Sequence, residues 1–410
     1  METKRKIEKY IEETLPVCTR ERKEDDFEVK LYGLPYPYSV PSAGHFDELY
    51  YWDTYFLNMM FRFNGQWHQM KNNADDMLYM VERFGYMGNS NRMWHLKTSQ
   101  PPFLSEIVKE VYQHYNDKDW LESSYRTLEK EYEFWMTKRM TEIGLNQYGC
   151  MLEEKDVESS SKHLPYRVGY APEGVSKYEL ARQYLIACES GWDMCYRWGF
   201  EAHMYAQVDL NSILYGFEKN MEYFAEELGL EESAKWMRRA EKRKKLMNRY
   251  MLAKNSMFYD YSMRTKELGI FTSASVFPLY FGLANEKQAQ AFAENVTRIE
   301  EEYGVTICEK HEIKGNYQWA YPNAWPCMQH LVVFGLERYG YTDIALRIGK
   351  KYVGMVERIF EETGELWEKY NAVNGTHKSL GNDASIMLGW TAGTYLTIKN
   401  YIEEKESGLK

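Results

Sequence analysis

The chain has 410 residues, of which 44% are apolar and 16% aromatic, and its 61 acidic and 51 basic residues give a formal net charge of -10. The charges are spread along the chain without a long basic block, so composition excludes a phosphate-tracking surface, and no nucleic-acid partner is expected. The 12 Trp and 35 Tyr suit the apolar faces and hydroxyl edges of sugars, but they equally suit interfaces and thick helical cores.

The first segment, residues 1–16 (METKRKIEKYIEETLP), carries a charge every few residues and lacks the apolar run of a signal peptide. Nowhere do about 18 apolar residues follow one another, as a membrane-crossing helix requires. We therefore expect a soluble, cytoplasmic protein without a membrane partner. The six cysteines are scattered and form no CxxC pair, so reduced thiols are expected rather than a zinc site or a dithiol centre.

An aromatic-rich stretch follows at residues 45–56 (HFDELYYWDTYF), in which Asp53 comes directly after Trp52. The carboxylate of Asp53 could hold hydroxyl groups of a sugar. The alternative interpretation is the start of an amphipathic helix.

From about residue 105 to the C-terminus the sequence reads as successive helices with apolar residues three and four apart, as in residues 205–228. No linker divides the chain, so we predict one catalytic domain over residues 1–410, with residues 1–40 as an N-terminal extension packed on it. The helices follow no fixed short repeat, which favours a closed array of helical hairpins with its loops gathered at one end. Two short runs, residues 257–261 and 304–308, read equally as small hairpins or as helix ends.

The segment ESGWDMCYRW at residues 189–198 ends a helical run and places Asp193 directly after Gly191 and Trp192. A glycine lets the helix end sharply. An apolar neighbour raises the pKa of a carboxyl, as a proton donor near neutral pH requires. The alternative is an ordinary helix cap, because Asp is common at helix boundaries.

Residues 318–326 (QWAYPNAWP) crowd amide and aromatic side chains into a loop that leads into the next helix. The amides of Gln318 and Asn323 can make paired hydrogen bonds to adjacent sugar hydroxyls while Trp faces stack on the ring. We interpret this loop as one wall of a saccharide site, with core packing as the alternative.

Residues 365–371 (ELWEKYN) flank Glu368 with Trp367 and Tyr370. Glycoside hydrolysis without a cofactor needs two carboxyl groups, and Asp193 and Glu368 fit that need. They lie 175 positions apart (368 minus 193), so only a closed fold could bring them together; the alternative is that Glu368 merely pairs with Lys369 or an Arg. The sequence contains no GxSxG, P-loop or HExxH pattern, so neither a metal nor a cofactor is expected.

Several of these segments occur in a fixed order over residues 41–393: WDTYF at 52–56, NRMWHLKTSQPP at 91–102, ESGWD at 189–193, VDLN at 208–211, QWAYPNAW at 318–325, and EKYN with GWTAG within 368–393. In this combination the chain resembles the trehalases, family 37 of the glycoside hydrolases, and related family 63 enzymes share parts of it. The resemblance covers nearly the whole chain.

The resemblance implies an all-α fold, the (α/α)6 toroid of six inner and six outer helices, with the site at the funnel end and an inverting mechanism. In trehalases the Asp of ESGWD is the general acid and the Glu of EKY is the general base, which here are Asp193 and Glu368. Inversion requires their carboxyls to lie about 6.5 to 9.5 Å apart. By the same resemblance the glucose-binding residues are Trp52, Asp53, Asn91, Gln100, Trp192, Gln318 and Trp319.

The chain departs from the family where trehalases place sugar-binding charges. His45 and Asp47 replace two arginines, Thr98 replaces a third, and residues 171–178 (APEGVSKY) replace a fourth arginine-bearing loop. Before GWTAG, Asp383 is the remaining candidate for a family carboxylate. Each hydrogen bond lost to a charged group removes about 1.5 to 3 kcal/mol, so we expect the hydrolytic machinery to be kept and trehalose recognition to be altered.

The sequence therefore predicts an inverting hydrolase of a small α-glucoside or a related α-linked disaccharide or glycoconjugate. One alternative is a true α,α-trehalase whose aglycone subsite is rebuilt. Another is a non-catalytic sugar-binding protein, against which the presence of both carboxylates argues. The sequence does not decide the oligomeric state.

Overall fold

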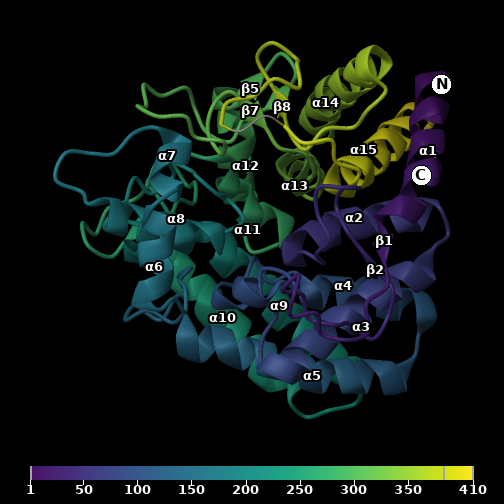
Figure 1. The fold of residues 1–410 in the computed structure, drawn as a ribbon, viewed down its shortest axis with the longest axis horizontal. Coiled ribbons are helices and arrows are strands. Elements are labelled where there is room, and N and C mark those ends of the chain that lie inside the picture. Colours follow the sequence, from purple (N-terminus) through teal and green to yellow (C-terminus); the bar gives the residue numbers. More distant parts are fainter. Residues whose placement is uncertain (1, 382–383, 409–410) are drawn as a thin grey trace.

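The computed structural model describes residues 2–381 and 384–408, and within them six helices form a closed inner ring in which each contacts the next. The last helix of the ring contacts the first, which closes it (Figure 1). In chain order the inner helices are α2 (Tyr51–Phe63), α4 (Leu104–Tyr115), α9 (Val208–Glu227), α11 (Phe277–Tyr280), α13 (Pro326–Glu337) and α15 (Gly389–Ser407).

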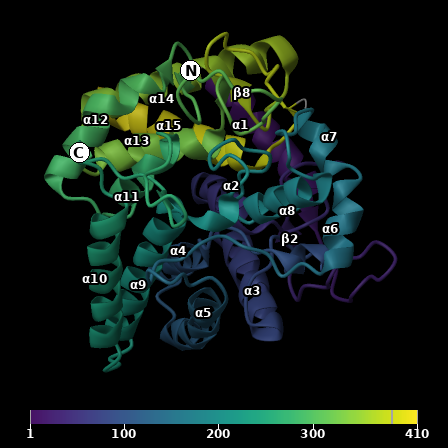
Figure 2. The same ribbon diagram turned by 90° about the vertical axis from the view of Figure 1, so that its left-hand side faces the viewer.

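A second layer of helices surrounds this ring. Its members are α1 (Glu2–Thr14), α3 (Trp67–Phe84), α5 (Lys118–Lys138), α10 (Ser233–Tyr250), α12 (Glu286–Asn295) and α14 (Thr342–Thr363). Most of them lie toward the periphery of Figure 1, and Figure 2 shows α9 and α10 side by side. The arrangement is the (α/α)6 toroid, which confirms the predicted all-α fold.

The inner helices are buried on all sides over most of their length, whereas the outer helices are buried only on the side that faces the ring. The inner helix α2 buries every residue from Tyr51 to Phe61, because it has neighbours all round. The outer helix α14 keeps an apolar stripe toward the core and a charged face outside. Helices α15 and α2 touch at Gly393, where an added Cβ would lie 1.9 Å from the carbonyl oxygen of Phe56.

The N-terminal helix α1 packs against α14, and Lys4 Nζ donates to Asn400 Oδ1 of α15 at 3.1 Å. Ile7 and Ile11 on its inner face are fully buried. Helix α1 thus lies in the outer layer beside the last inner helix.

Three further helices follow α5 and precede α9 in the chain, and they lie to one side of the ring (Figure 1). They are α6 (Glu154–Ser161), α7 (Leu164–Val168) and α8 (Lys177–Cys188). Apolar side chains of α7 and α8 form a small core of their own with Met194 and Tyr317. This insertion therefore packs directly on the segment that carries Asp193.

Short strands pair loops that are distant in sequence. The antiparallel pairs are β1 (Thr19–Arg20) with β2 (Tyr38–Ser39), β3 (Tyr205–Ala206) with β4 (Tyr261–Ser262), β5 (Glu300–Glu301) with β6 (Gly304–Val305), and β7 (Asn323–Ala324) with β8 (Tyr370–Asn371). Of the two ambiguous runs, residues 304–308 begin with the second strand of a tight hairpin, and 257–261 end at β4. Pairing of β3 also delays α9, which begins at Val208 rather than at residue 205.

Single 3-10 turns complete the fold at η1 (Leu15–Cys18), η2 (Met93–Lys97), η3 (Ala202–Met204), η4 (Ser273–Val276) and η5 (Val296–Arg298). Among the described helices, none combines the length and the apolarity needed to cross a bilayer.

Glu131 of α5 is fully buried, and its carboxyl accepts a hydrogen bond from Tyr51 Oη at 2.6 Å. Burial raises the pKa of Glu131 to about 8, against about 4 in an unfolded chain. A group that keeps its proton longer when folded stabilises the fold below its unfolded pKa, and this contribution is lost as the pH rises through the folded value.

We therefore expect the thermal unfolding midpoint to decrease as the pH is raised from about 5 to about 8. Glu131→Gln should reduce this pH-dependent loss of stability by about 2 kcal/mol. Differential scanning calorimetry at both pH values measures the unfolding midpoint of each variant. Glu133→Gln, an exposed change on the same helix, is the control. Equal pH dependence in both variants would contradict the prediction.

Candidate active site

A cavity of about 770 Å³ opens where the inner helices α2, α13 and α15 begin. The closed ring places these helix starts at one end, because each outer helix returns the chain before the next inner helix. The predicted site residues that line the cavity are Trp52, Asp53, Gln100, Asp193, Gln318, Trp319 and Glu368.

Backbone pairing between loops brings the two predicted catalytic carboxyls to this cavity. Cys195, two residues after Asp193, forms a parallel bridge with Trp319. Strand β7 then pairs with β8, which begins two residues after Glu368. The loop at residues 318–326 therefore acts as the common partner of both carboxylate-bearing segments.

The turn before Asp193 depends on close contact with α2. Gly191 has a φ of 72° and an added Cβ would lie 2.6 Å from the indole of Trp52, so only glycine fits. Glu189 is fully buried and accepts two hydrogen bonds from Arg139, at 2.6 and 2.7 Å. These contacts fix the end of α8 and with it the backbone of Asp193.

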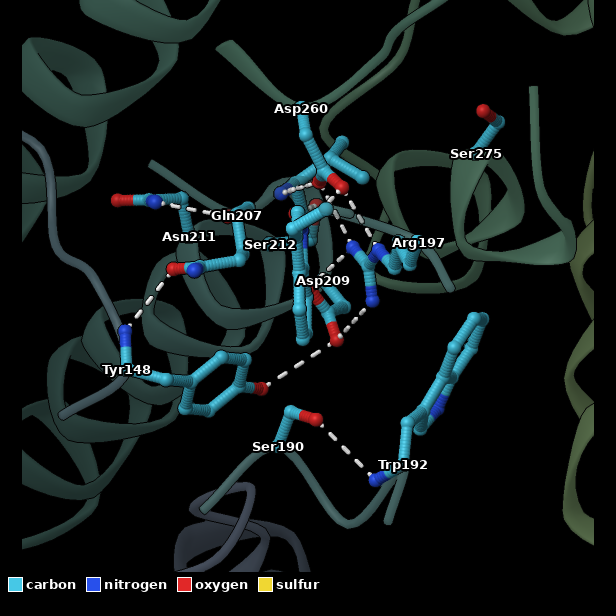
Figure 3. A network of polar contacts seen from close by, with 12 residues as sticks. Tyr148, Ser190, Trp192, Arg197, Gln207, Asp209, Asn211, Ser212, Asp260 and Ser275 are labelled. Atoms are coloured by element: carbon cyan, nitrogen blue, oxygen red, sulfur yellow. Dashed lines mark hydrogen bonds and ion pairs between the residues drawn. The ribbon is translucent and has the colours of Figure 1, made fainter. Parts of the chain in front are cut away.

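The segment after Asp193 is held by a buried charge network (Figure 3). The guanidinium of Arg197 donates to both carboxylate oxygens of Asp209, at 2.7 and 2.9 Å, and to both of Asp260, at 2.7 Å. Its face also lies over Trp192, 4.6 Å from the ring centroid. Arg197 thus ties the Asp193 loop to the start of α9.

Arg197→Met should destabilise the fold by about 3 to 5 kcal/mol, because it leaves two buried carboxylates without their cation. Urea denaturation measures the loss. Arg264→Met is the matched control, since Arg264 pairs with Glu201 on the surface and such pairs contribute at most about 1 kcal/mol. Similar unfolding midpoints for the two variants would refute this role for Arg197.

The floor of the cavity is aromatic. Trp319 is sandwiched between Trp192, at 5.2 Å between centroids, and Trp325, at 3.9 Å, with ring planes within 14°. Trp390 meets Trp325 edge-on. Both faces of Trp319 are therefore occupied by other indoles, so Trp319 lines the cavity without offering a face on which a sugar could stack, and the packing alternative applies to this residue.

Asp193 is partly exposed at the cavity wall. Burial is the main influence on its carboxyl and raises its pKa; Arg167 and the Cys188 thiol lower it, and the charge of Glu368 raises it. A carboxyl with a raised pKa keeps a proton closer to neutral pH, as a proton donor requires.

Asp53 is a second carboxyl in this cavity whose pKa is raised. Burial raises the pKa of Asp53 to about 8, and the charges of Glu368 and Asp193 contribute to the rise. Asp53 therefore carries a proton at neutral pH and can donate a hydrogen bond to a sugar oxygen.

Glu368 lines the same cavity and pairs with its neighbour Lys369, whose Nζ is 3.0 Å from Glu368 Oε2. The side chain of Lys369 is fully buried, so Glu368 is the group that faces its ammonium. The Lys369 pairing considered from the sequence thus exists, and Glu368 lines the cavity as well. Among the described residues, no group of three His, Cys, Asp or Glu side chains is arranged to hold a metal ion.

Three predicted sugar-binding residues do not line the cavity. Asn91 bonds to the backbone of Leu49 and Tyr32, and Asn323 bonds to the backbone of Gln318 and Leu380. Trp192 is buried under Trp319, as described above. The amides and the indole at these positions contact the backbone and the core behind the wall, and their direct contact with a sugar stays a prediction.

The residues found here at positions where the family has arginines also differ in whether they line the cavity. Thr98 lines the cavity, whereas His45 and Asp47 are exposed outside it, and Asp47 pairs with Arg20 at 2.8 Å. Residues 171–178 do not line it either. Asp383 lies outside the described residues.

A cation nevertheless reaches the cavity from an element that carries no recognisable motif. Arg167 of α7 lines the wall near Asp193, and the insertion also contributes His163. Trp94, half of whose surface is exposed, and Tyr50 provide aromatic surface at the wall. Sequence reasoning missed these residues; the aromatic density around residue 50 was the available signal for Tyr50.

Comparison with known proteins agrees with this site. The family model described as trehalase matches residues 2–402. The periplasmic trehalase of Xanthomonas oryzae pv. oryzae is 29% identical over an alignment of 405 residues, and the match covers 90% of this chain and 69% of that protein.

Solved structures share the fold. Neutral trehalase Nth1 from Saccharomyces cerevisiae superposes with a TM-score of 0.75 at 25% identity, covering 89% of this chain and 74% of that one. The GH63 mannosylglycerate hydrolase from Thermus thermophilus in complex with glucose gives a TM-score of 0.64 at 15% identity, covering 96% and 99%, and this likeness concerns the fold alone. Because the family match spans nearly the whole chain, the protein belongs to the trehalase family and is a glycosidase.

Proposed function

We propose that the protein is an inverting hydrolase of a small α-glucoside or related α-linked disaccharide or glycoconjugate, with Asp193 as general acid and Glu368 as general base. The observation that carries the proposal is the presence of both carboxyl groups in the lining of one cavity. Burial raises the pKa of Asp193, as a proton donor requires, and Glu368 Oε2 lies 3.0 Å from the buried ammonium of Lys369. Glycoside hydrolysis needs two such carboxyl groups, one as acid and one as base.

In this mechanism Asp193 gives its proton to the glycosidic oxygen as the bond from that oxygen to the anomeric carbon breaks. Glu368 takes a proton from a water molecule, whose oxygen attacks the anomeric carbon from the other face. Asp53 and Gln318 bind hydroxyl groups of the glycosyl unit, and Gln100 accepts from the backbone N–H of Trp52 at 3.2 Å, which positions the start of α2.

A true α,α-trehalase with a rebuilt aglycone side is the second candidate. The names of two relatives support it, and so does Arg167, because a guanidinium at the cavity wall can replace part of the lost arginine contacts. The two candidates differ in whether the aglycone side accepts a second glucose.

The test is hydrolysis of trehalose, kojibiose, nigerose, maltose, isomaltose, sucrose, glucosylglycerate and mannosylglycerate, with the anomer of the released sugar followed by NMR. β-Glucose from trehalose identifies an inverting trehalase. Inverting cleavage of another member alone supports the first candidate. Release of the α-anomer contradicts the mechanism. If none of these substrates is hydrolysed, a sugar-binding protein is favoured.

A further inference from the structure

A second cavity, of about 750 Å³, lies at the opposite end of the inner ring. Helix α2 lines both cavities with different turns: it gives Trp52 and Asp53 to the active-site cavity and Tyr55, Met59 and Arg62 to the far one. Helix α15 likewise gives Trp390 to the active-site cavity and Thr397 to the far-end cavity, which is also lined by α4, α9, α11 and α13.

A chain of hydrogen-bonding side chains lies in the wall of the far-end cavity. Tyr55 Oη and Tyr280 Oη are 2.6 Å apart, and Tyr280 Oη is 3.2 Å from His330 Nε2. All three side chains belong to inner helices, so the wall is rigidly held. Hydroxyls and imidazole both donate and accept, which suits a ligand that does the same.

Charged and amide groups extend this wall. Arg62 Nη1 donates to Glu110 Oε1 at 3.4 Å, Lys109 Nζ donates to Asn220 Oδ1 at 3.1 Å, and Asn220 Nδ2 donates to Glu106 Oε1 at 2.6 Å. Both carboxylates therefore have a neighbour of opposite charge or a polar partner. Lys219 and Arg338 also line the cavity; Lys219 pairs with Glu222, and Arg338 Nη1 donates to the backbone oxygen of Tyr280 at 3.2 Å. Because every charged side chain in the described lining has such a partner, the wall favours a neutral ligand over an ion.

Three buried polar atoms of these lining residues have no hydrogen-bond partner among the described residues: Arg62 Nε, Glu110 Oε2 and His330 Nδ1. The His330 side chain is only 3% exposed. Leaving such groups unpaired costs about 1 to 3 kcal/mol each, so a structure that keeps them gains when they are satisfied.

We propose that the far-end cavity is a second, non-catalytic binding site for a neutral polyhydroxylated molecule, of the size of a monosaccharide. Alternating donors and acceptors meet sugar hydroxyls, and the rings of Tyr215, Tyr223 and Phe334 supply apolar surface for the CH groups.

The far-end cavity and the active-site cavity are separate, so one bound molecule cannot occupy both. Phe56 stands between them, with its ring edge-on to Trp52 at 5.8 Å and to His330 at 5.9 Å between centroids. A ligand in the far-end cavity is therefore separated from the cavity that Asp193 lines.

The two sites can be observed separately. Five Trp side chains line the active-site cavity, whereas the described lining of the far-end cavity contains none. We expect calorimetric titration of the full chain with D-glucose to show a binding event that leaves Trp fluorescence unchanged, besides the event that changes it. We call the binding event that changes Trp fluorescence the fluorescent event, and the one that leaves it unchanged the silent event. A titration that shows only the fluorescent event overturns the proposal. A silent event that occurs with inorganic phosphate but not with glucose overturns it as well.

Tyr280→Phe combined with Glu106→Gln should weaken the silent event about tenfold, with the fluorescent event and the hydrolytic rate unchanged. Tyr115→Phe with Glu122→Gln, two exposed positions outside both cavities, is the matched control. Equal affinities in the two double variants overturn the assignment. If the test variant fails to fold, a crystal structure of the wild-type protein with glucose decides, since density in the far-end cavity supports the proposal and an empty cavity rejects it.

Discussion

Asp193→Asn is expected to lower kcat on a disaccharide substrate by about 10²- to 10⁴-fold, the usual contribution of a positioned proton donor. The amide keeps the size and most contacts of the carboxyl but cannot protonate the leaving oxygen. In the wild-type protein, the rate should also fall as the pH rises through the raised pKa of Asp193, because the donor then loses its proton.

The leaving group distinguishes this role from a structural one. A fluoride leaving group needs little protonation, so Asp193→Asn should retain far more activity on α-glucosyl fluoride than on a disaccharide. Asp53→Asn is the matched control, because it makes the same change in the same cavity and should mainly raise KM. If Asp53→Asn shows the leaving-group dependence instead, Asp53 is the acid.

Glu368→Gln is expected to lower kcat by a similar factor on both kinds of substrate, because the water that it activates is needed whichever group leaves. The same change removes the charge that faces the buried ammonium of Lys369, 3.0 Å away. We therefore also expect a loss of stability of about 1 to 3 kcal/mol.

The double variant Glu368→Gln with Lys369→Met separates catalysis from ion pairing. It removes the unpaired ammonium, so the unfolding midpoint should recover while the rate stays low. Initial rates and thermal unfolding of the single and double variants measure both effects. Recovery of the rate together with the stability would show that Glu368 serves only as the partner of Lys369.

The local sequence was sufficient to predict the helices and several of the residues that line the cavity. Apolar spacing of three and four residues reflects contacts within single helices, and it indicated the all-α fold. Residues such as Asp193, Glu368 and Gln318 stood out because polar groups among aromatics in loops are poorly explained by core packing. Helix spacing alone favoured a closed array of helical hairpins, and the family resemblance specified it as a toroid of six inner and six outer helices.

Which side chains face the cavity depended on contacts between segments that are far apart in the chain. Asn91 and Asn323 look like sugar ligands in sequence, yet in the fold they satisfy backbone groups behind the wall. Arg167 carries no motif and reaches the cavity because the inserted helices pack on the Asp193 segment. The helices and the chemically active residue types could be recognised in the sequence, since they arise from local periodicity and composition. Which of those residues meet depends on the fold, because the pairing of distant loops follows from ring closure and not from any local pattern.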